Sequence, residues 1–308
     1  MKLFREVPHF AFMKNRFIFL GMSGAIVALS LFFIFTKGLN YGTDFMGGVK
    51  LQYQFPKTVS DGEIRKTLMD LHLGDVSVVR YGRAEENRFV IKVSKPALDT
   101  TTLSPTITPV LTRAFGEQGL VLEKEESVGP KVGQELRRKG LMTVLFSLFC
   151  MLVYIGFRFD FYFAPGAIVA LFHDVIVTLG IFALLQLEFN LTILAAVLTI
   201  VGYSLNDTII VFDRIREHTR LINPESIEEV VNTSINETLA RTLITSMIVF
   251  FVVMVLFFFG GATIKDFAFA FVIGVITGTY STFSIACPIY IAMYRHFPKV
   301  QSALGKKG

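Results

Sequence analysis

The sequence has 308 residues with a formal net charge of +5, and 52% of the residues are hydrophobic. Its mean hydropathy of +0.56 is higher than a water-soluble surface allows, which excludes a pair of ordinary soluble domains. Lysine and arginine lie mainly at the edges of apolar runs, where anionic lipid attracts them, so the positive charge does not indicate nucleic-acid binding. Cys150 and Cys287 both lie inside apolar runs, which excludes a disulfide framework and a CxxC metal site.

Six apolar runs approach the length of about 20 helical residues that a bilayer core of about 30 Å requires. The first, Phe17–Thr36, is longer than the apolar part of a signal peptide and lacks a convincing cleavage site, so we interpret it as an uncleaved first span. We therefore predict a polytopic α-helical membrane protein with six transmembrane helices. The other five runs are Leu141–Phe157, Phe161–Leu187, Phe189–Phe212, Thr242–Gly260 and Phe267–Tyr294.

Charges in the short loops predict the orientation. Basic residues before span one and after spans two, four and six fall on one side, which the positive-inside rule makes cytoplasmic, together with both termini. They include Lys14, Arg158, Arg214 and, in the tail, Lys299, Lys306 and Lys307. The run Arg137-Arg138-Lys139 is an exception, because it enters span two from the opposite side.

The region between the first two spans alternates between strand and helix patterns. The order is βαββαβ, which predicts a ferredoxin-like external α+β domain, although a compact spacer without further activity is an alternative. We expect residues 1–36 to form the N-terminus and first span, 37–140 the external domain, 141–294 a five-span bundle and 295–308 a basic tail. The predicted elements are strand Val49–Phe55, helix Asp61–Leu71, strands Val76–Tyr81 and Phe89–Val93, helix Ser104–Phe115 and strand Leu120–Val128.

After span four, Asn223-Pro224-Glu225 has the pattern of a helix start. We expect a helix that runs from there through Glu228, Val231 and Ile235 toward span five and lies along the membrane surface.

Ionisable side chains inside spans indicate function, because each costs about 2.5 kcal/mol or more at the bilayer centre. Asp207, beside Asn206 in span four, and Arg241 in span five lie at similar depth if the two helices are neighbours, so they could pair. Two interpretations stay open: a salt bridge that locks the helices, or a titrating carboxylate whose pairing changes as an ion passes. A polar stripe on span five accompanies Arg241 and consists of Thr238, Thr242 and Thr245.

Span three contains His173-Asp174 near its midpoint. Neighbouring residues on a helix point about 100° apart, so a shared metal site is not expected, and a helix contact or a relay role of Asp174 are the alternatives. The P-loop, HExxH and GxSxG motifs are absent, so we expect neither an enzyme nor a resident cofactor. The membrane potential, at about 2.3 kcal/mol per charge per 100 mV, is then the obvious energy source.

Four strings resemble the SecD/SecF family of protein-export membrane proteins. Residues 42–48 (GTDFMGG) resemble its GxDFxGG signature, and residues 128–133 (VGPKVG) resemble the string before its second span. Residues 201–217 are similar to the fourth-span signature of the SecF branch, and residues 232–243 to the segment that follows it. The resemblance covers essentially the whole chain, in the family's order.

The resemblance implies an accessory subunit of the bacterial Sec translocase, of the resistance-nodulation-division superfamily, in the cytoplasmic (inner) membrane. It implies SecD as the heteromeric partner in a twelve-span assembly, with SecYEG, YajC and a preprotein as further partners. Proton or sodium flow would drive movement of the external domains, so a transported ion is implied.

By motif position, the resemblance also assigns residues. The ion-pathway candidates are Asp207, Arg241, Asn206 and Asp174. The structural or coupling candidates are Asp44, Gly47 and Gly48 at the turn after span one, and Asp213 and Arg214 at the cytoplasmic end of span four. The role of His173 stays open.

Two other functions compete with this one. A half of a small-molecule or lipid exporter of the same superfamily would belong to a twelve-span chain with a second external domain. A non-transporting scaffold of the translocon would tolerate neutralisation of Asp207.

Overall fold

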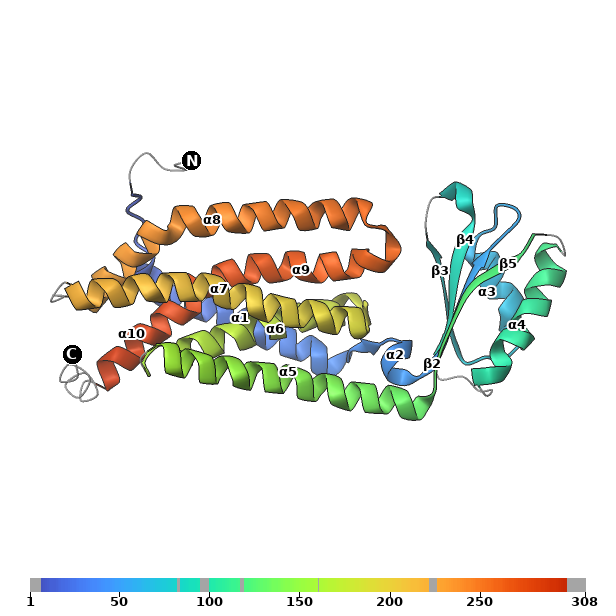
Figure 1. The fold of residues 1–308 in the computed structure, drawn as a ribbon, viewed down its shortest axis with the longest axis horizontal. Coiled ribbons are helices and arrows are strands. Elements are labelled where there is room, and N and C mark those ends of the chain that lie inside the picture. The colour runs from blue at the N-terminus through green and yellow to red at the C-terminus, as the bar shows by residue number, and fades with distance from the viewer. Residues whose placement is uncertain are drawn as a thin grey trace.

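The computed structural model describes residues 7–81, 84–94, 100–116, 119–159, 161–221 and 226–297. A long helical bundle occupies one end of the molecule and a small α+β domain the other (Figure 1). The expected helix start at Asn223-Pro224-Glu225 and the tail residues Lys299, Lys306 and Lys307 lie outside the described residues.

Within the described residues, 6 helical segments are long and apolar enough to cross a membrane. The predicted architecture of six spans with an inserted α+β domain is therefore confirmed. The segments are α1 (Arg16–Thr36), α5 (Pro130–Arg158), α6 (Ala164–Leu185), α7 (Leu191–Leu221), α8 (Ile227–Phe259), and α9 (Gly261–Ser281) with η3 (Thr282–Ala286) and α10 (Cys287–His296). Three of the helices, α5, α7 and α8, extend beyond their apolar runs at one end, whereas α6 is shorter than its run, and the first span is preceded by η1 (Met13–Asn15).

The residues expected to form a surface helix belong instead to α8. This helix begins after Ser226 and continues, in the expected direction, through the fifth span to Phe259, but its first part packs into the bundle and does not form a surface segment. Val231 and Ile235 are buried and pack into the same hydrophobic cluster as residues of α6, α7 and α10. Because neither glycine nor proline interrupts this stretch, the segment continues the helix into the span.

The sixth span contains one π-helical turn, η3, between α9 and α10. Pro288 follows directly, near the start of α10. A proline lacks the N–H that an α-helix needs and its ring clashes with the preceding turn, and a wider turn relieves that clash. This irregularity lies next to the buried polar residues of the bundle.

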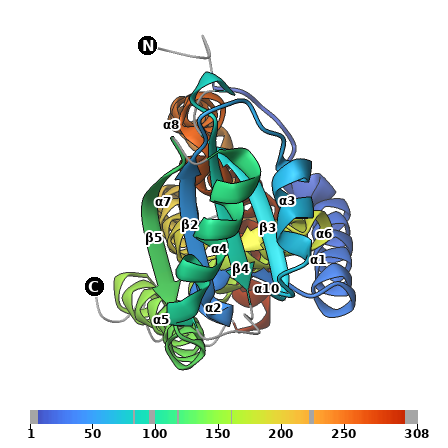
Figure 2. The same cartoon turned by 90° about the vertical axis from the view of Figure 1, so that its right-hand side faces the viewer.

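The α+β domain follows the expected βαββαβ order. Its elements are β2 (Gly48–Gln54), α3 (Asp61–Met69), β3 (Asp75–Tyr81), the short η2 (Ala84–Glu86), β4 (Arg88–Ser94), α4 (Thr100–Phe115) and β5 (Val121–Val128). The antiparallel sheet has the order β3-β4-β2-β5, which is compatible with a ferredoxin-like arrangement. Both long helices cover the sheet face that is turned away from the bundle (Figures 1 and 2).

Alternation along the strands explains the core of this domain. Val49, Leu51 and Tyr53 of β2 are fully buried and point to one face, as the two-residue period of a strand requires. Helix α3 starts with a capping box in which Ser60 and Glu63 satisfy each other's backbone amides.

A short junction connects this domain to the bundle. It consists of β1 (Asn40–Tyr41), α2 (Thr43–Met46) and β6 (Glu188–Phe189), and β1 pairs with β6 in parallel. The junction therefore binds the segment after the first span to the loop between the third and fourth spans.

Candidate functional site

Asp174 is the centre of a fully buried polar network in the middle of the bundle. Its side chain is 0% exposed and is held by three helices. Oδ2 accepts hydrogen bonds from the hydroxyls of Ser204 on α7 at 2.6 Å and Ser281 on α9 at 2.8 Å. Oδ1 lies 2.9 Å from Nδ1 of the adjacent His173. A carboxylate in this position needs such partners, because leaving a charge unpaired in a membrane is expensive.

Small residues let α9 approach α7 closely enough to form this network. A Cβ on Gly274 would lie 2.2 Å from Ile200, and a Cβ on Gly278 would lie 2.9 Å from the Cβ of Ser204. Two glycines four residues apart provide the close contact typical of packed membrane helices. The sequence analysis did not single out either glycine or the serines, although the four-residue spacing is a usable signal.

Asp207 lies three residues after Ser204 on α7, about 4.5 Å further along the helix axis. It is also 0% exposed, and its Oδ2 accepts a hydrogen bond from Ser246 of α8 at 3.3 Å. Ser246 in turn lies 2.8 Å from Thr279 of α9 and accepts from Tyr203 at 3.1 Å.

Three buried polar atoms in this region have no hydrogen-bond partner among the described residues: Asp207 Oδ1, Thr242 Oγ1 and His173 Nε2. Buried polar atoms are nearly always satisfied, so these unpaired atoms mark positions where a water or an ion can bind.

Further hydroxyl groups on α7 lie between the positions of the two carboxylates, although no hydrogen bond between described residues joins them to Asp207. Thr208, next to Asp207, lies 3.0 Å from Thr282, the first residue of the π-helical turn, and donates to the backbone of Ser204 at 3.2 Å. Ser204 then donates to Asp174. The buried polar residues around Asp174 and Asp207 thus come from α6, α7, α8, α9 and η3.

The expected pairing of Asp207 with Arg241 is not present. The ion pairs between described residues do not join them, and Arg241 is exposed on the outside of α8. Helix α8 turns Thr242 and Ser246 inward, and neighbouring positions on a helix point about 100° apart, so Arg241 starts from a different face of the helix than Thr242. The interpretation as a structural salt bridge therefore does not describe this structure.

Asn206 and most of the threonine stripe on span five do not face the buried polar network. Asn206 is exposed on the outer side of α7, and it takes no part in the Asp174 network. Thr238 and Thr245 donate to backbone carbonyls of their own helix, whereas Thr242 is buried without a partner. Among the residues of the stripe, Thr242 is thus the one that faces the buried polar network.

The motif residues after span one build the junction. The carboxylate of Asp44 accepts from the backbone amide of Leu191 at 3.0 Å and so caps the start of α7. Gly47 has φ +77°, and a Cβ there would lie 2.7 Å from the Cα of Pro130 at the start of α5. A Cβ on Gly48 would lie 2.2 Å from the carbonyl oxygen of Val93. Both glycines are therefore required by close backbone contacts.

A second connection, which the sequence analysis missed, joins the sheet to the bundle. Lys92 of β4 forms a salt bridge with Glu188 of β6, and both side chains are about one-fifth exposed. Glu188 is the single residue between the apolar runs Phe161–Leu187 and Phe189–Phe212. The partner could not be found from the sequence, because the two residues are 96 positions apart.

The motif residues at the other end of α7 lie in ion pairs. Asp213 pairs with Arg158 of α5 at 3.2 Å, and Arg214 pairs with Glu237 of α8 and with Glu217. These contacts position the ends of three helices. The described residues contain no group of three or more side chains of the kinds that bind a metal ion.

Comparison with known proteins gives a consistent result. The family model "Protein export membrane protein SecD/SecF, C-terminal" matches residues 107–296, and the model of the SecD/SecF GG motif matches residues 32–59. The protein translocase subunit SecF of Calditerrivibrio nitroreducens is 44% identical over 93% of this chain and 94% of its own length.

Two solved structures of SecDF proteins resemble the chain as well. SecDF of Thermus thermophilus, described as a translocon-associated membrane protein, matches 94% of this chain with a TM-score of 0.82 and 34% identity. SecDF in a super-membrane-facing form matches 98% of it with a TM-score of 0.71 and the same 34% identity. The chain spans 39% and 41% of those two longer chains. Because a family model matches more than half of the chain and a curated relative matches nearly all of it, the chain belongs to the SecD/SecF family of protein-export membrane proteins.

Proposed function

We propose that this chain is an accessory subunit of the bacterial Sec translocase that uses a proton or sodium gradient to assist preprotein translocation and release on the non-cytoplasmic side. One observation carries the proposal: Asp207 is a fully buried carboxylate whose Oδ1 has no partner among the described residues. Such a group gains from binding a proton or a sodium ion, and it releases the ion when a new partner reaches it.

A second carboxylate lies one helical turn away, because Ser204 of α7 holds Asp174 and Asp207 follows three residues later on the same helix. An ion at Asp207 changes the hydrogen bond of Ser246, and a shift of α7 that follows also moves Ser204 against Asp174. Because these residues lie on α6 to α9, ion binding alters contacts between helices and not only within one. A differential affinity for two packings of the bundle is the requirement for converting ion flow into movement.

The exposed polar residues of spans four and five favour the presence of a partner subunit that covers them. Asn206 and Arg241 lie on the outer surface of the chain at membrane depth, where direct contact with lipid is costly. A second six-span half of the SecD type covers such a face, as the longer SecDF chains suggest. In that assembly Arg241 acts as a counter-charge that comes into direct contact with Asp207 when the bundle repacks.

The junction transmits movement of the bundle to the external domain. Asp44 holds the start of α7, the helix that carries Asp207, and Lys92 holds the loop just before it. A shift of α7 therefore changes the position of the sheet. The existence of SecDF in a named second form, less similar to this chain, agrees with such a movement.

The same proposal gives the membrane location and the partner proteins of the chain. The chain lies in the bacterial inner membrane with both termini in the cytoplasm, beside SecD, SecYEG and YajC. The preprotein is the substrate on the side of the α+β domain.

The test is gradient-dependent translocation of a preprotein into vesicles that contain this chain, its SecD-type partner and the translocon. Asp207→Asn and Arg241→Met should abolish the stimulation by an imposed gradient and leave gradient-independent translocation unchanged. Glu217→Gln is the matched control, because it removes a carboxylate from the exposed end of the same helix. Full stimulation in both test variants would refute the proposal. Separate collapse of the proton and sodium gradients identifies the ion.

A further inference from the structure

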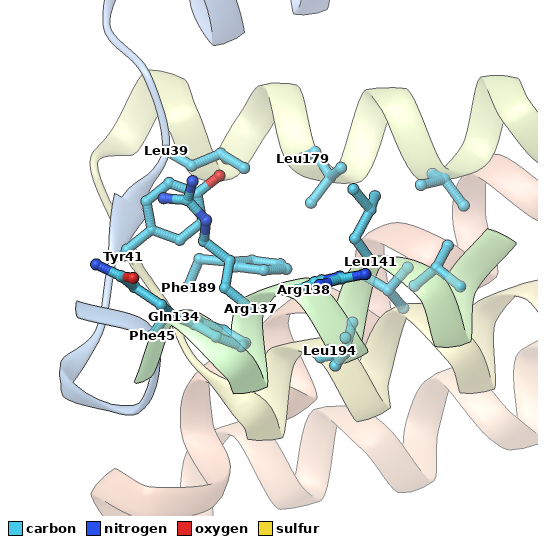
Figure 3. Close-up of a pocket in the computed structure, with 14 residues that line it drawn as sticks. Leu39, Tyr41, Phe45, Gln134, Arg137, Arg138, Leu141, Leu179, Phe189 and Leu194 are labelled. Carbon is cyan, nitrogen blue, oxygen red and sulfur yellow. The ribbon is translucent and has the colours of Figure 1, made fainter. Parts of the chain in front are cut away.

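A cavity of about 640 Å³ lies between α5, α6 and α7 at the end of the bundle next to the α+β domain. This volume is within the range of about 300–1,000 Å³ that is usual for small-molecule sites. Figure 3 shows that leucines from three helices surround its deeper part, among them Leu141, Leu179 and Leu194. Leu141 is 63% exposed, so the cavity opens at the surface of α5 that faces the bilayer.

Two arginines of α5, Arg137 and Arg138, line the cavity together with Gln134 and make its lining cationic. Figure 3 shows that their side chains extend in different directions, Arg137 toward Tyr41 and Arg138 toward Leu141. Both arginines are exposed, and the ion pairs between described residues include neither of them, whereas the next residue, Lys139, is paired with Glu135 at 2.9 Å. The guanidinium of Arg137 lies 5.3 Å from the ring centre of Tyr41, which fixes its direction.

The depth of these groups matches the boundary between headgroups and hydrocarbon. Arg137 is seven residues after the start of α5, about 10 Å along the helix at 1.5 Å per residue. The apolar run of the span begins four residues later, at Leu141. A planar guanidinium at this level can donate two hydrogen bonds to a phosphate, while an acyl chain continues into the apolar cavity.

We propose that this cavity binds one anionic phospholipid, with its phosphate on Arg137 and Arg138 and one acyl chain among the leucines. The site is separate from the proposed ion path. It also explains why the run Arg137-Arg138-Lys139 lies on the side that the positive-inside rule disfavours: two of its charges serve a local site. Phe45 and Phe189 of the junction line the same cavity, so the lipid contacts the segments that connect bundle and external domain.

The test counts lipid molecules bound per chain by native mass spectrometry. The full-length protein in detergent is mixed with phosphatidylglycerol or phosphatidylcholine and is then released from the detergent in the spectrometer. The wild type should retain more phosphatidylglycerol than phosphatidylcholine. Arg137→Gln with Arg138→Gln should weaken phosphatidylglycerol binding about 25-fold, because each basic residue near an anionic surface contributes about five-fold. The control Lys131→Gln with Lys139→Gln removes the same charge from the same helix outside the lining, and it should weaken binding less than about five-fold.

A second pair of variants tests the cavity itself. Leu179→Trp fills the cavity and should reduce retention of both lipids, whereas Leu184→Trp, on the same helix but outside the lining, should not. Equal retention of both lipids by the wild type, equal losses in the arginine and lysine variants, or equal retention in the two tryptophan variants would each overturn the proposal.

Discussion

Gly47 offers a sharp test of how the external domain is attached to the bundle. Its φ of +77° and ψ of 154° lie in a region that only glycine occupies readily, so Gly47→Ala imposes a strain of about 1–3 kcal/mol. The added Cβ would lie 2.7 Å from Cα and 2.9 Å from N of Pro130. These are backbone atoms that cannot rotate away, and overpacking of this kind costs about 1–3 kcal/mol more. The junction should therefore lose about 2–6 kcal/mol.

Amide exchange of the full-length protein measures this loss locally. The amide of Gly42 is bonded to the carbonyl of Phe189 at 2.9 Å and exchanges only when the junction opens. A loss of 2 kcal/mol, the lower bound, accelerates its exchange about 25-fold. Gly129→Ala is the matched control, because its backbone is extended and a Cβ there meets nothing within 4 Å. Equal exchange rates in the two variants would refute the reasoning.

Three further predictions concern the junction and the external domain. Asp44→Ala removes the cap of α7 and should lower stability by about 0.5–2 kcal/mol in thermal unfolding, and an unchanged transition would contradict that role. Lys92→Glu and Glu188→Lys should each loosen the domain, and the double swap should recover about 0.5–3 kcal/mol as coupling in a double-mutant cycle; purely additive effects would exclude the pairing. Hydrogen bonds from the backbone and side chain of Ser60 hold the pKa of Glu63 below its ordinary value. The charged form therefore stabilises α3 above the unfolded pKa, and this contribution is lost as the pH falls through the lower folded pKa. Amide exchange in α3 should accelerate over that acidic range in the wild type but not in Glu63→Gln, and the same acid response in both would contradict the assignment.

The sequence alone determined the elements and their order. Long apolar runs identify membrane helices because the bilayer imposes a length, and the alternating pattern of residues 49–55 identifies a half-buried strand because side chains alternate across a sheet. The glycines of the motif at residues 42–48 were recognisable as special, because few other residues adopt such backbone angles. Asp174 and Asp207 could be selected because charges inside a span are costly.

Only the tertiary structure decided how the helices are rotated about their axes. Helices α6 and α8 are apolar on nearly every face, so their periodicity does not show which side faces the bundle. For this reason the sequence paired Asp207 with Arg241, whereas packing presents Ser246 to it. The partners of Asp174 come from α7 and α9, 30 and 107 residues away, and contacts at such separations depend on the simultaneous packing of all helices. Lys92 and Glu188 meet for the same reason, because the fold brings the sheet against the end of the bundle.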